Sequence, residues 1–268
     1  MDLSKVKLVV TDMDGTLLNS QNEVSNRFYE LYDALKKRDV HFVAASGRQY
    51  YSIIDKLAPI KDEITIIAEN GGLAKYRDEE IVVTDLPLNE VKKLTTLFKG
   101  INDVYPVICG NKNAYTQNNE DYFTAILEKY YSKYSIVDDL TMVKNDIVFK
   151  MAVYHFENSE KYIYPIVKHL EKTMQIKVSG HHWVDISHIN ANKGYALQLV
   201  QQRLGIDKTE TMVFGDFNND LEMLACADYS FAMENAHPNV KKTANFLTKS
   251  NDDFGVETVL EQLVRAKN

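Results

Sequence analysis

The sequence predicts an α/β protein, a Rossmann-like doubly wound parallel sheet core with an inserted α+β cap domain. Toward both ends of the 268-residue chain, short apolar runs alternate with amphipathic stretches, the pattern of repeated strand–helix units. The middle differs, because nine of the sixteen tyrosines lie between Tyr105 and Tyr164 and no arginine occurs between Arg77 and Arg203. We therefore expect a core in two parts, residues 1–83 and 186–268, and a cap domain at residues 84–185.

The opening residues predict the first strand–helix unit. Residues 6–10 form an apolar run that indicates a buried strand ending near Asp12. Ser25 is a residue type favoured at a helix N-cap. After it, apolar residues recur at the spacing of one helical face: Phe28, Leu31, Tyr32 and Leu35. We expect this helix to pack on the sheet.

Later strands of the predicted core end in polar residues. Residues 41–45 are followed by Ser46-Gly47-Arg48, and residues 64–68 by Glu69-Asn70-Gly71-Gly72. Farther on, Lys193 opens a helix that Gly205 closes, residues 212–214 lead into Gly215-Asp216, and a further strand spans 230–233. Because ligands bind beyond the carboxyl ends of the strands in an open parallel sheet, we expect these polar residues to share one site.

The middle segment predicts a separate α+β layer. Residues 148–154 are typical of a strand. Helices are expected at 88–98, 121–131 and 159–173.

Two aspartates, Asp12 and Asp14, stand where the first strand ends, and Gly15 permits a tight turn after them. One carboxylate of such a pair can attack phosphorus while the other serves the leaving group. The Asp-x-Asp-Gly pattern also occurs in calcium loops, but such loops need further oxygen ligands, and here the apolar Leu17 and Leu18 follow. The pattern therefore favours phosphoryl transfer.

Four motifs in this order resemble the haloacid dehalogenase superfamily, and specifically its Cof-type sugar and metabolite phosphatases. They are Asp12-x-Asp14-Gly15-Thr16-Leu17, Ser46-Gly47-Arg48, Lys193-Gly194 and Gly215-Asp216-Phe217-Asn218-Asn219-Asp220. Further similarity lies in residues 69–72 and 232–236. The resemblance covers both core segments and is weakest across the cap, where the family chooses its substrates.

The resemblance implies a division of chemical roles. Asp12 is expected to form an aspartyl-phosphate, Asp14 to act as acid and base, and Lys193 to neutralise charge in the transition state. It further implies that Ser46, Gly47, Arg48 and Asn219 bind phosphate or substrate. The implied Mg²⁺ ligands are the Asp12 carboxylate, the Asp14 backbone carbonyl and Asp216, with Asp220 holding the metal waters or Lys193. Phe217 departs from the small residue common in the family.

Electrostatics supports a metal independently of the family. Several carboxylates that converge on a dianionic phosphate would repel it, and a divalent cation together with Lys193 removes that repulsion.

Composition limits the partners. The net charge of -7 leaves no basic face for many phosphates, so we expect no nucleic-acid partner. No run of about 18 apolar residues occurs, so we expect no membrane span. Cys109 and Cys226 lack metal-type spacing, and a reducing, cytoplasmic location is expected. Protein partners stay open.

We therefore expect a Mg²⁺-dependent phosphatase acting on a small phosphorylated metabolite, such as a sugar phosphate or a phosphorylated cofactor. One alternative is a hexose phosphomutase of the same superfamily, although the cap lacks arginines to grip a second phosphate. Another is a non-catalytic regulator that binds phosphometabolites, although a binder needs no nucleophile. The cap-to-core histidines His181, His182 and His188 could contact substrate or be structural.

Overall fold

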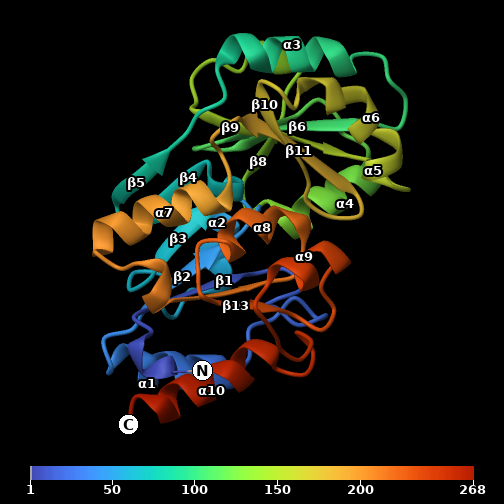
Figure 1. Ribbon diagram of the computed structural model, residues 1–268. Helices are drawn as coiled ribbons and strands as arrows, with labels where there is room; N and C mark the ends of the chain where they lie inside the picture. Colours follow the sequence, from blue (N-terminus) through green and yellow to red (C-terminus); the bar gives the residue numbers. More distant parts are fainter. Residues whose placement is uncertain (1) are drawn as a thin grey trace.

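The computed structural model describes residues 2–268 as two β-sheets with helices around each (Figure 1). The first sheet has eight strands in the order β14-β13-β12-β1-β2-β3-β4-β5. Its bounds are β1 (Leu8–Asp12), β2 (His41–Ala45), β3 (Thr65–Ala68), β4 (Leu73–Tyr76), β5 (Glu79–Val83), β12 (Thr211–Gly215), β13 (Tyr229–Ala232) and β14 (Phe246–Leu247). Neighbouring strands from β14 to β3 are parallel, which confirms the α/β fold class predicted from the sequence.

Helices cover both faces of the first sheet. In Figure 1, α1 (Asn26–Lys36) and α10 (Gly255–Ala266) lie together on one face, and α7 (Lys193–Leu204) and α8 (Leu221–Leu224) lie on the other. The remaining helices here are α2 (Tyr50–Lys56) and α9 (Pro238–Thr243). Because both faces are covered, every residue of β1 is buried, as an apolar strand in a parallel sheet requires.

Local signals set the ends of two of these helices. The Ser25 hydroxyl accepts a hydrogen bond from the backbone N–H of Phe28 and caps α1, as predicted. Helix α7 begins at Lys193, and Gly205 ends it in the left-handed conformation.

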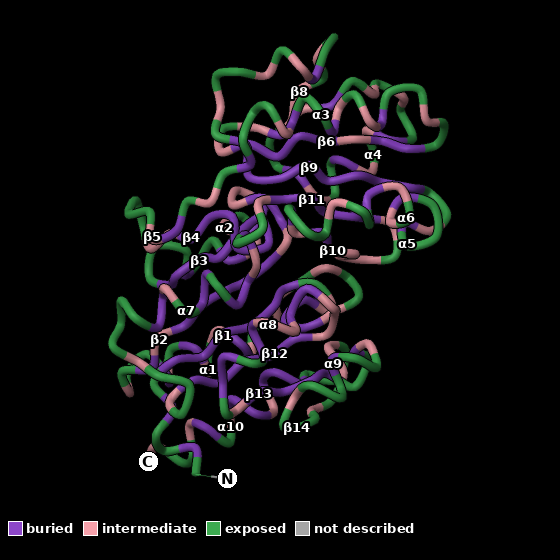
Figure 2. Tube along the Cα trace, turned by 45° about the horizontal axis from the view of Figure 1, so that its top comes forward, coloured by how far each residue is buried: buried purple, intermediate pink, exposed green. Residues whose placement is uncertain are grey.

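The second sheet has six strands in the order β10-β11-β9-β6-β7-β8. They are β6 (Tyr105–Gly110), β7 (Ala114–Thr116), β8 (Tyr134–Ile136), β9 (Val148–Tyr154), β10 (Met174–Val178) and β11 (Trp183–His188). Its helices include α3 (Leu88–Phe98), α4 (Asp121–Tyr130), α5 (Ser159–Tyr162) and α6 (Tyr164–Val167). Separate apolar clusters pack on its two faces, and Figure 2 shows that strands of both sheets are mostly buried.

Two details differ from the expectation. The helix expected at residues 159–173 is broken into α5, α6 and a 3₁₀ turn, because Pro165 near the start of α6 has no N–H to continue a helix. The first sheet also ends in an antiparallel hairpin of β4 and β5, whose turn holds Arg77 at a positive φ.

The division into core and cap at residues 84 and 185 stays a proposal. The chain passes from the first sheet to the second after β5 and returns between β11, which extends to His188, and α7. Of residues 2–268, none lies in a helix with the length and apolar character needed to cross a bilayer.

Candidate active site

Strand β1 delivers Asp12 to the carboxyl edge of the first sheet. It lies between β12 and β2, and Asp12 stands opposite Ala45, the last residue of β2. The side chain of Asp12 is almost completely buried. This carboxylate therefore stands at the sheet edge where the polar residues of the other strand ends were predicted to gather.

Lys193 joins the two halves of the predicted core at this point. Its Nζ donates hydrogen bonds to Asp12 Oδ1 at 2.5 Å and to Asp220 Oδ1 at 2.7 Å. The residue is fully buried. Burial alone would lower the pKa of Lys193, but the charges of Asp12 and Asp220 outweigh it and raise that pKa. Lys193 therefore remains a cation beneath the site.

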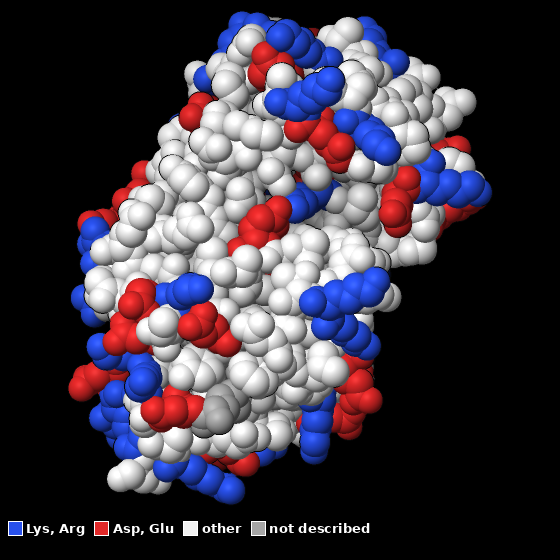
Figure 3. Space-filling view, viewed as in Figure 1, with Lys and Arg blue, Asp and Glu red and all other residues white. Residues whose placement is uncertain are grey.

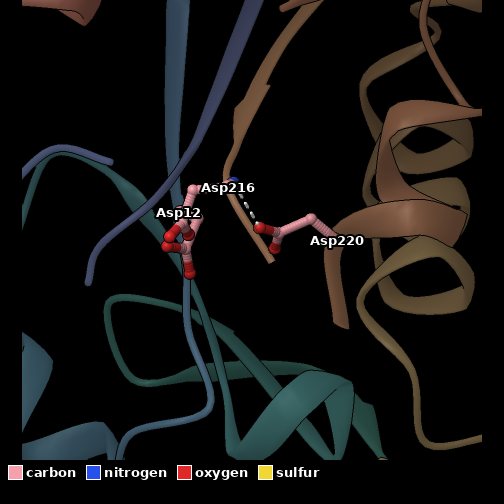
Figure 4. Close-up of side chains that lie close together, drawn as sticks. All are labelled: Asp12, Asp216 and Asp220. Atoms are coloured by element: carbon pink, nitrogen blue, oxygen red, sulfur yellow. Dashed lines mark hydrogen bonds between the residues drawn. The ribbon is translucent and has the colours of Figure 1, made fainter. Parts of the chain in front are cut away.

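Three carboxylates gather around this cation. Asp12, Asp216 and Asp220 offer oxygen atoms that all lie within 4.8 Å of one another (Figure 4). Burial, with the neighbouring carboxylates, raises the pKa of Asp12 to about 7 and that of Asp216 to about 9. One lysine thus leaves the cluster short of positive charge.

Asp220 has a different role from its two neighbours. Its Oδ2 accepts hydrogen bonds from the backbone N–H groups of Asp216 at 2.9 Å and Phe217 at 3.2 Å, while Oδ1 accepts from Lys193. Both of its oxygens are thereby occupied in holding the strand end and the lysine. Asp12 and Asp216 are therefore the members of the cluster whose carboxylate oxygens are available as metal ligands. A buried carboxylate paired with a half-buried one fits a hard divalent cation such as Mg²⁺.

Asp14 lies apart from this cluster. Its side chain is 47% exposed and accepts two hydrogen bonds from Arg48, at 2.7 Å from Nε and 2.5 Å from Nη2. Arg48 also donates to Asn22 Oδ1 at 3.0 Å, and its guanidinium lies over the Tyr130 ring. Arg48, which we expected to bind substrate, therefore holds Asp14 in this structure.

Ser46, Gly47 and Arg48 form the loop after β2, in which Ser46 and Arg48 are buried. The Ser46 hydroxyl accepts a hydrogen bond from the backbone N–H of Arg48 at 3.1 Å. Asn219 donates to Asn70 Oδ1 at 3.0 Å and so lies beside the same loop, because Asn70 packs against Gly47.

A cavity of about 310 Å³ joins these groups. Its walls come from both sheets. The first-sheet side contributes Asp12, Asp14, Gly15, Ser46, Gly47, Arg48, Asp216, Phe217 and Asn219, and the second-sheet side Tyr130, Tyr131, Lys150, Ser179, Gly180, His181, His182, Trp183 and Asp185. Of the three histidines considered from the sequence, His181 and His182 line this cavity, whereas His188 is not among its lining residues.

Sequence reasoning gave no role to a second buried charge cluster at this cavity. Lys150 Nζ lies 3.0 Å from Asp185 Oδ2 and 3.3 Å from Glu69 Oε2, and all three side chains are buried. The available signal was a charged residue in the middle of the apolar run Val148–Tyr154. Of its partners, Glu69 was expected at the shared strand-end site but not as a partner of Lys150, and Asp185 gave no signal of its own.

We predict that Gly15→Ala displaces Asp216. Gly15 has a φ of +74°, and a Cβ there would overlap with Asp216 Oδ2. A shift of the carboxylate by about 1 Å is expected to lower kcat/KM by about 100-fold. Steady-state kinetics checks this, with Gly100→Ala as the matched control, because Gly100 has a φ of +79° and nothing within 4 Å. Equal losses in both variants would contradict the role given to Asp216.

A second prediction concerns stability without metal. The folded-state pKa values of Asp12 and Asp216, about 7 and about 9, lie above their ordinary value of 3.8. The folded protein therefore binds more protons than the unfolded chain across this range, and the free energy of unfolding falls as pH rises from about 4 to about 9. Glu69, whose pKa burial raises to about 7, adds to the same slope.

Thermal unfolding in chelator-containing buffer between pH 5 and pH 8 measures this slope. We expect Tm to fall with rising pH, and Asp216→Asn to flatten the dependence. A Tm that rises from pH 5 to pH 8 would contradict the claim that the folded protein binds more protons than the unfolded chain.

Comparison with known proteins identifies the family to which the sequence is similar. The sequence matches the family of haloacid dehalogenase-like hydrolases over residues 9–260. It is 33% identical over 266 residues to the 5-amino-6-(5-phospho-D-ribitylamino)uracil phosphatase YbjI of Escherichia coli, with 97% of each chain covered.

Solved structures resemble the fold over nearly the whole chain. SMU.1108c from Streptococcus mutans superposes with a TM-score of 0.90 at 28% identity, covering 97% of this chain and 99% of the other. A haloacid dehalogenase-like hydrolase from Bacteroides thetaiotaomicron gives a TM-score of 0.82 at 26% identity, covering 96% and 99%. The likeness thus extends over both sheets.

Proposed function

We propose a substrate class and a mechanism for this chain, which belongs to the haloacid dehalogenase-like hydrolase family and is a phosphoric monoester hydrolase. The proposed reaction is Mg²⁺-dependent hydrolysis of a small phosphorylated metabolite, such as a sugar phosphate or a phosphorylated cofactor. The observation that carries the proposal is the buried contact of Asp12 with Lys193, beside Asp216, on one wall of the cavity. The site thereby combines a nucleophile in Asp12, a fixed cation in Lys193 and a further metal ligand in Asp216.

Asp12 is the proposed nucleophile. Its Oδ1 accepts the hydrogen bond from Lys193, and among the described residues no hydrogen bond reaches Oδ2. A carboxylate oxygen attacks phosphorus, the bond to the ester oxygen breaks, and the phosphoryl group is held as an aspartyl-phosphate. Lys193 stabilises negative charge that develops during this transfer.

Asp14 is the proposed proton carrier, since its carboxylate lies on the cavity wall apart from the metal cluster. It gives a proton to the departing alkoxide and later takes one from the water that attacks phosphorus, so it ends each cycle as it began. Arg48 orients the Asp14 side chain by its two hydrogen bonds. The Ser46 hydroxyl and the Gly47 N–H are proposed to hold phosphate oxygens.

Asp12, Asp216 and the Asp14 backbone carbonyl would hold Mg²⁺, which when bound supplies positive charge that lets the phosphate dianion approach the carboxylates. Burial, with the neighbouring carboxylates, raises the pKa values of Asp12 and Asp216. A bound cation would favour the ionised form of both carboxylates, which supports this assignment.

Hydrolysis is favoured over phosphomutase chemistry by the second-sheet wall of the cavity. That wall includes one permanent cation, Lys150. Lys150 already forms ion pairs with Asp185 and Glu69. A mutase needs a grip on a second phosphate, for which arginine forks are best suited. Supplying a hexose bisphosphate with its monophosphate separates the two, because a mutase forms the isomer and a phosphatase releases phosphate.

The face shown in Figure 3 carries acidic and basic side chains intermixed. This view and the net charge of -7 support a small-molecule substrate rather than a nucleic acid. Cys109 and Cys226 are both buried and free, which supports a reducing, cytoplasmic location as part of the proposal.

A panel of several dozen phosphorylated metabolites tests the function directly, by Mg²⁺-dependent release of phosphate. The panel includes sugar phosphates and, because the E. coli relative is named for such a compound, phosphorylated ribityl-bearing heterocycles. We expect release from at least one class and none after chelation. Binding of these esters with no release from any of them would favour the regulator alternative.

A further inference from the structure

The loop of Ser46, Gly47 and Arg48 has three consecutive carbonyl groups, and each accepts a hydrogen bond. Ser46 O accepts from the backbone N–H of Asn70 at 3.0 Å, and Arg48 O from that of Glu69 at 3.0 Å. These two donors follow β3 in the first sheet. Gly47 O instead accepts from Lys150 Nζ at 2.5 Å. The middle carbonyl of the loop is therefore held by a side chain of the second sheet.

Lys150 is fixed in place by more than this one bond. It lies in β9, is 3% exposed, and donates to Asp185 Oδ2 at 3.0 Å. Asp185, in β11, also accepts a hydrogen bond from the side-chain amide of Asn70. Asn70 in turn accepts from Asn219 at 3.0 Å. A continuous buried network thus extends from the second sheet, past the loop, to the segment that carries Asp216 and Asp220.

The bond to Gly47 acts on a single peptide unit. The carbonyl of that unit accepts from Lys150, and its N–H, which belongs to Arg48, donates to the Ser46 hydroxyl at 3.1 Å. The plane of the peptide is therefore held at both ends. Its orientation directs the Ser46 hydroxyl and the start of the Arg48 side chain.

Backbone strain at Glu69 and Asn70 indicates that the hydrogen bonds from this segment to the loop have a functional role. Glu69 and Asn70 have positive φ values of 52° and 54°, which non-glycine residues rarely adopt. Such backbone persists only where surrounding contacts maintain it, and it concentrates at functional sites. Here it aims two consecutive N–H groups at the loop carbonyls.

We infer that Lys150 is a positioning residue that couples the seating of the second sheet to the geometry of the phosphate-binding loop. When the second sheet is seated, Lys150 completes the set of hydrogen bonds to the loop carbonyls and the loop is preorganised for a phosphate dianion. When the second sheet moves away from the first, Gly47 O loses its hydrogen bond from Lys150 and the loop binds phosphate less tightly. This opening would favour release of product phosphate. This inference rests on the proposed function of the loop.

The test compares Lys150→Met with Lys177→Met. Lys177 of β10 also links the two sheets, through a 2.5 Å ion pair with Glu222 of α8, but it does not contact the loop. Isothermal titration with inorganic phosphate in Mg²⁺ measures loop affinity without turnover. Kinetics with two esters of different leaving groups measures whether the effect depends on the leaving group.

We expect Lys150→Met to weaken phosphate binding by about 10-fold to 100-fold, the loss of one charge-assisted hydrogen bond, and to raise KM for both esters by a similar factor. Lys177→Met is expected to change both by less than about 3-fold. Unchanged phosphate affinity in Lys150→Met, or equal losses in the two variants, would overturn the inference. A loss confined to one ester would also overturn it, because Lys150 would then recognise the leaving group.

Lys150→Met leaves Glu69 and Asp185 without their cation, so the variant could unfold. The double variant Lys150→Met with Glu69→Gln removes one of the two charges and keeps the Gly47 carbonyl unpartnered, and the same loss of phosphate affinity is expected. A double variant that binds phosphate as the wild type does would count against the inference. Wild-type protein that binds phosphate but hydrolyses no ester would contradict the proposed function alone, since the phosphate titration still tests Lys150.

Discussion

Replacing Asp12 with asparagine is expected to lower kcat by at least about 10⁴-fold, the scale seen when an enzyme loses its nucleophile. The amide has nearly the shape of the carboxylate but lacks its negative charge, so it cannot attack phosphorus. Asp12 is buried against Lys193, with further carboxylates nearby, and its pKa is raised to about 7 chiefly by burial. A neutral side chain therefore adds no repulsion, and we expect the metal-free variant to unfold at a Tm no lower than that of the wild type.

Initial rates with the best ester of the panel, together with circular dichroism and thermal unfolding, measure both parts of this prediction. Asp33→Asn is the matched control, because Asp33 is exposed on α1. An Asp12→Asn protein that keeps more than a few per cent of wild-type turnover would exclude Asp12 as the nucleophile.

Replacing Lys193 with methionine is expected to cost both activity and stability. The lysine is fully buried between Asp12 and Asp220, and its removal leaves their negative charges uncompensated. Breaking a buried pair in this way typically lowers the free energy of unfolding by about 3–5 kcal/mol. Turnover is expected to fall by at least about 10²-fold, because the cation also stabilises the transferring phosphoryl group. Urea unfolding and steady-state kinetics measure the two losses.

Lys7→Met is the matched control for charge removal. Lys7 pairs with Glu210 at the surface, where its side chain is 57% exposed. Such pairs contribute at most about 1 kcal/mol, so this variant is expected to keep its stability and activity. A Lys193→Met protein as stable as Lys7→Met would show that the buried lysine does not compensate the carboxylates.

Much of the first sheet could be predicted from the sequence, because its signals are local. The apolar run before Asp12 and the N-cap at Ser25 lie within the segments that they define. Gly205 likewise ends α7 by its own left-handed backbone. The β4–β5 hairpin was missed because its turn is made by Arg77 and Asp78 rather than by the glycine or asparagine that would have indicated it.

The candidate site could be predicted only in part. Parallel strands bring their carboxyl ends to one edge, so that Asp12 and Asp216, at the ends of β1 and β12, could be expected to meet, and they do. Lys193, 181 positions from Asp12 at the start of α7, was placed at the site by the family resemblance. The bidentate contact of Arg48 with Asp14 had no such signal, because it depends on side-chain rotamers within two loops. The links from Lys150 to Glu69 and to Gly47 depend on how the second sheet sits over the first, which no local pattern encodes.

The central claim is that Asp12 accepts the phosphoryl group covalently. Rapid acid quench during turnover of a radiolabelled ester tests it, followed by digestion and identification of the labelled peptide. We predict that the label resides on the peptide containing Asp12, is released by hydroxylamine as an acyl phosphate would be, and is missing in Asp12→Asn. Label on another residue, or wild-type protein that turns over the ester at full rate without ever carrying label, would contradict the account.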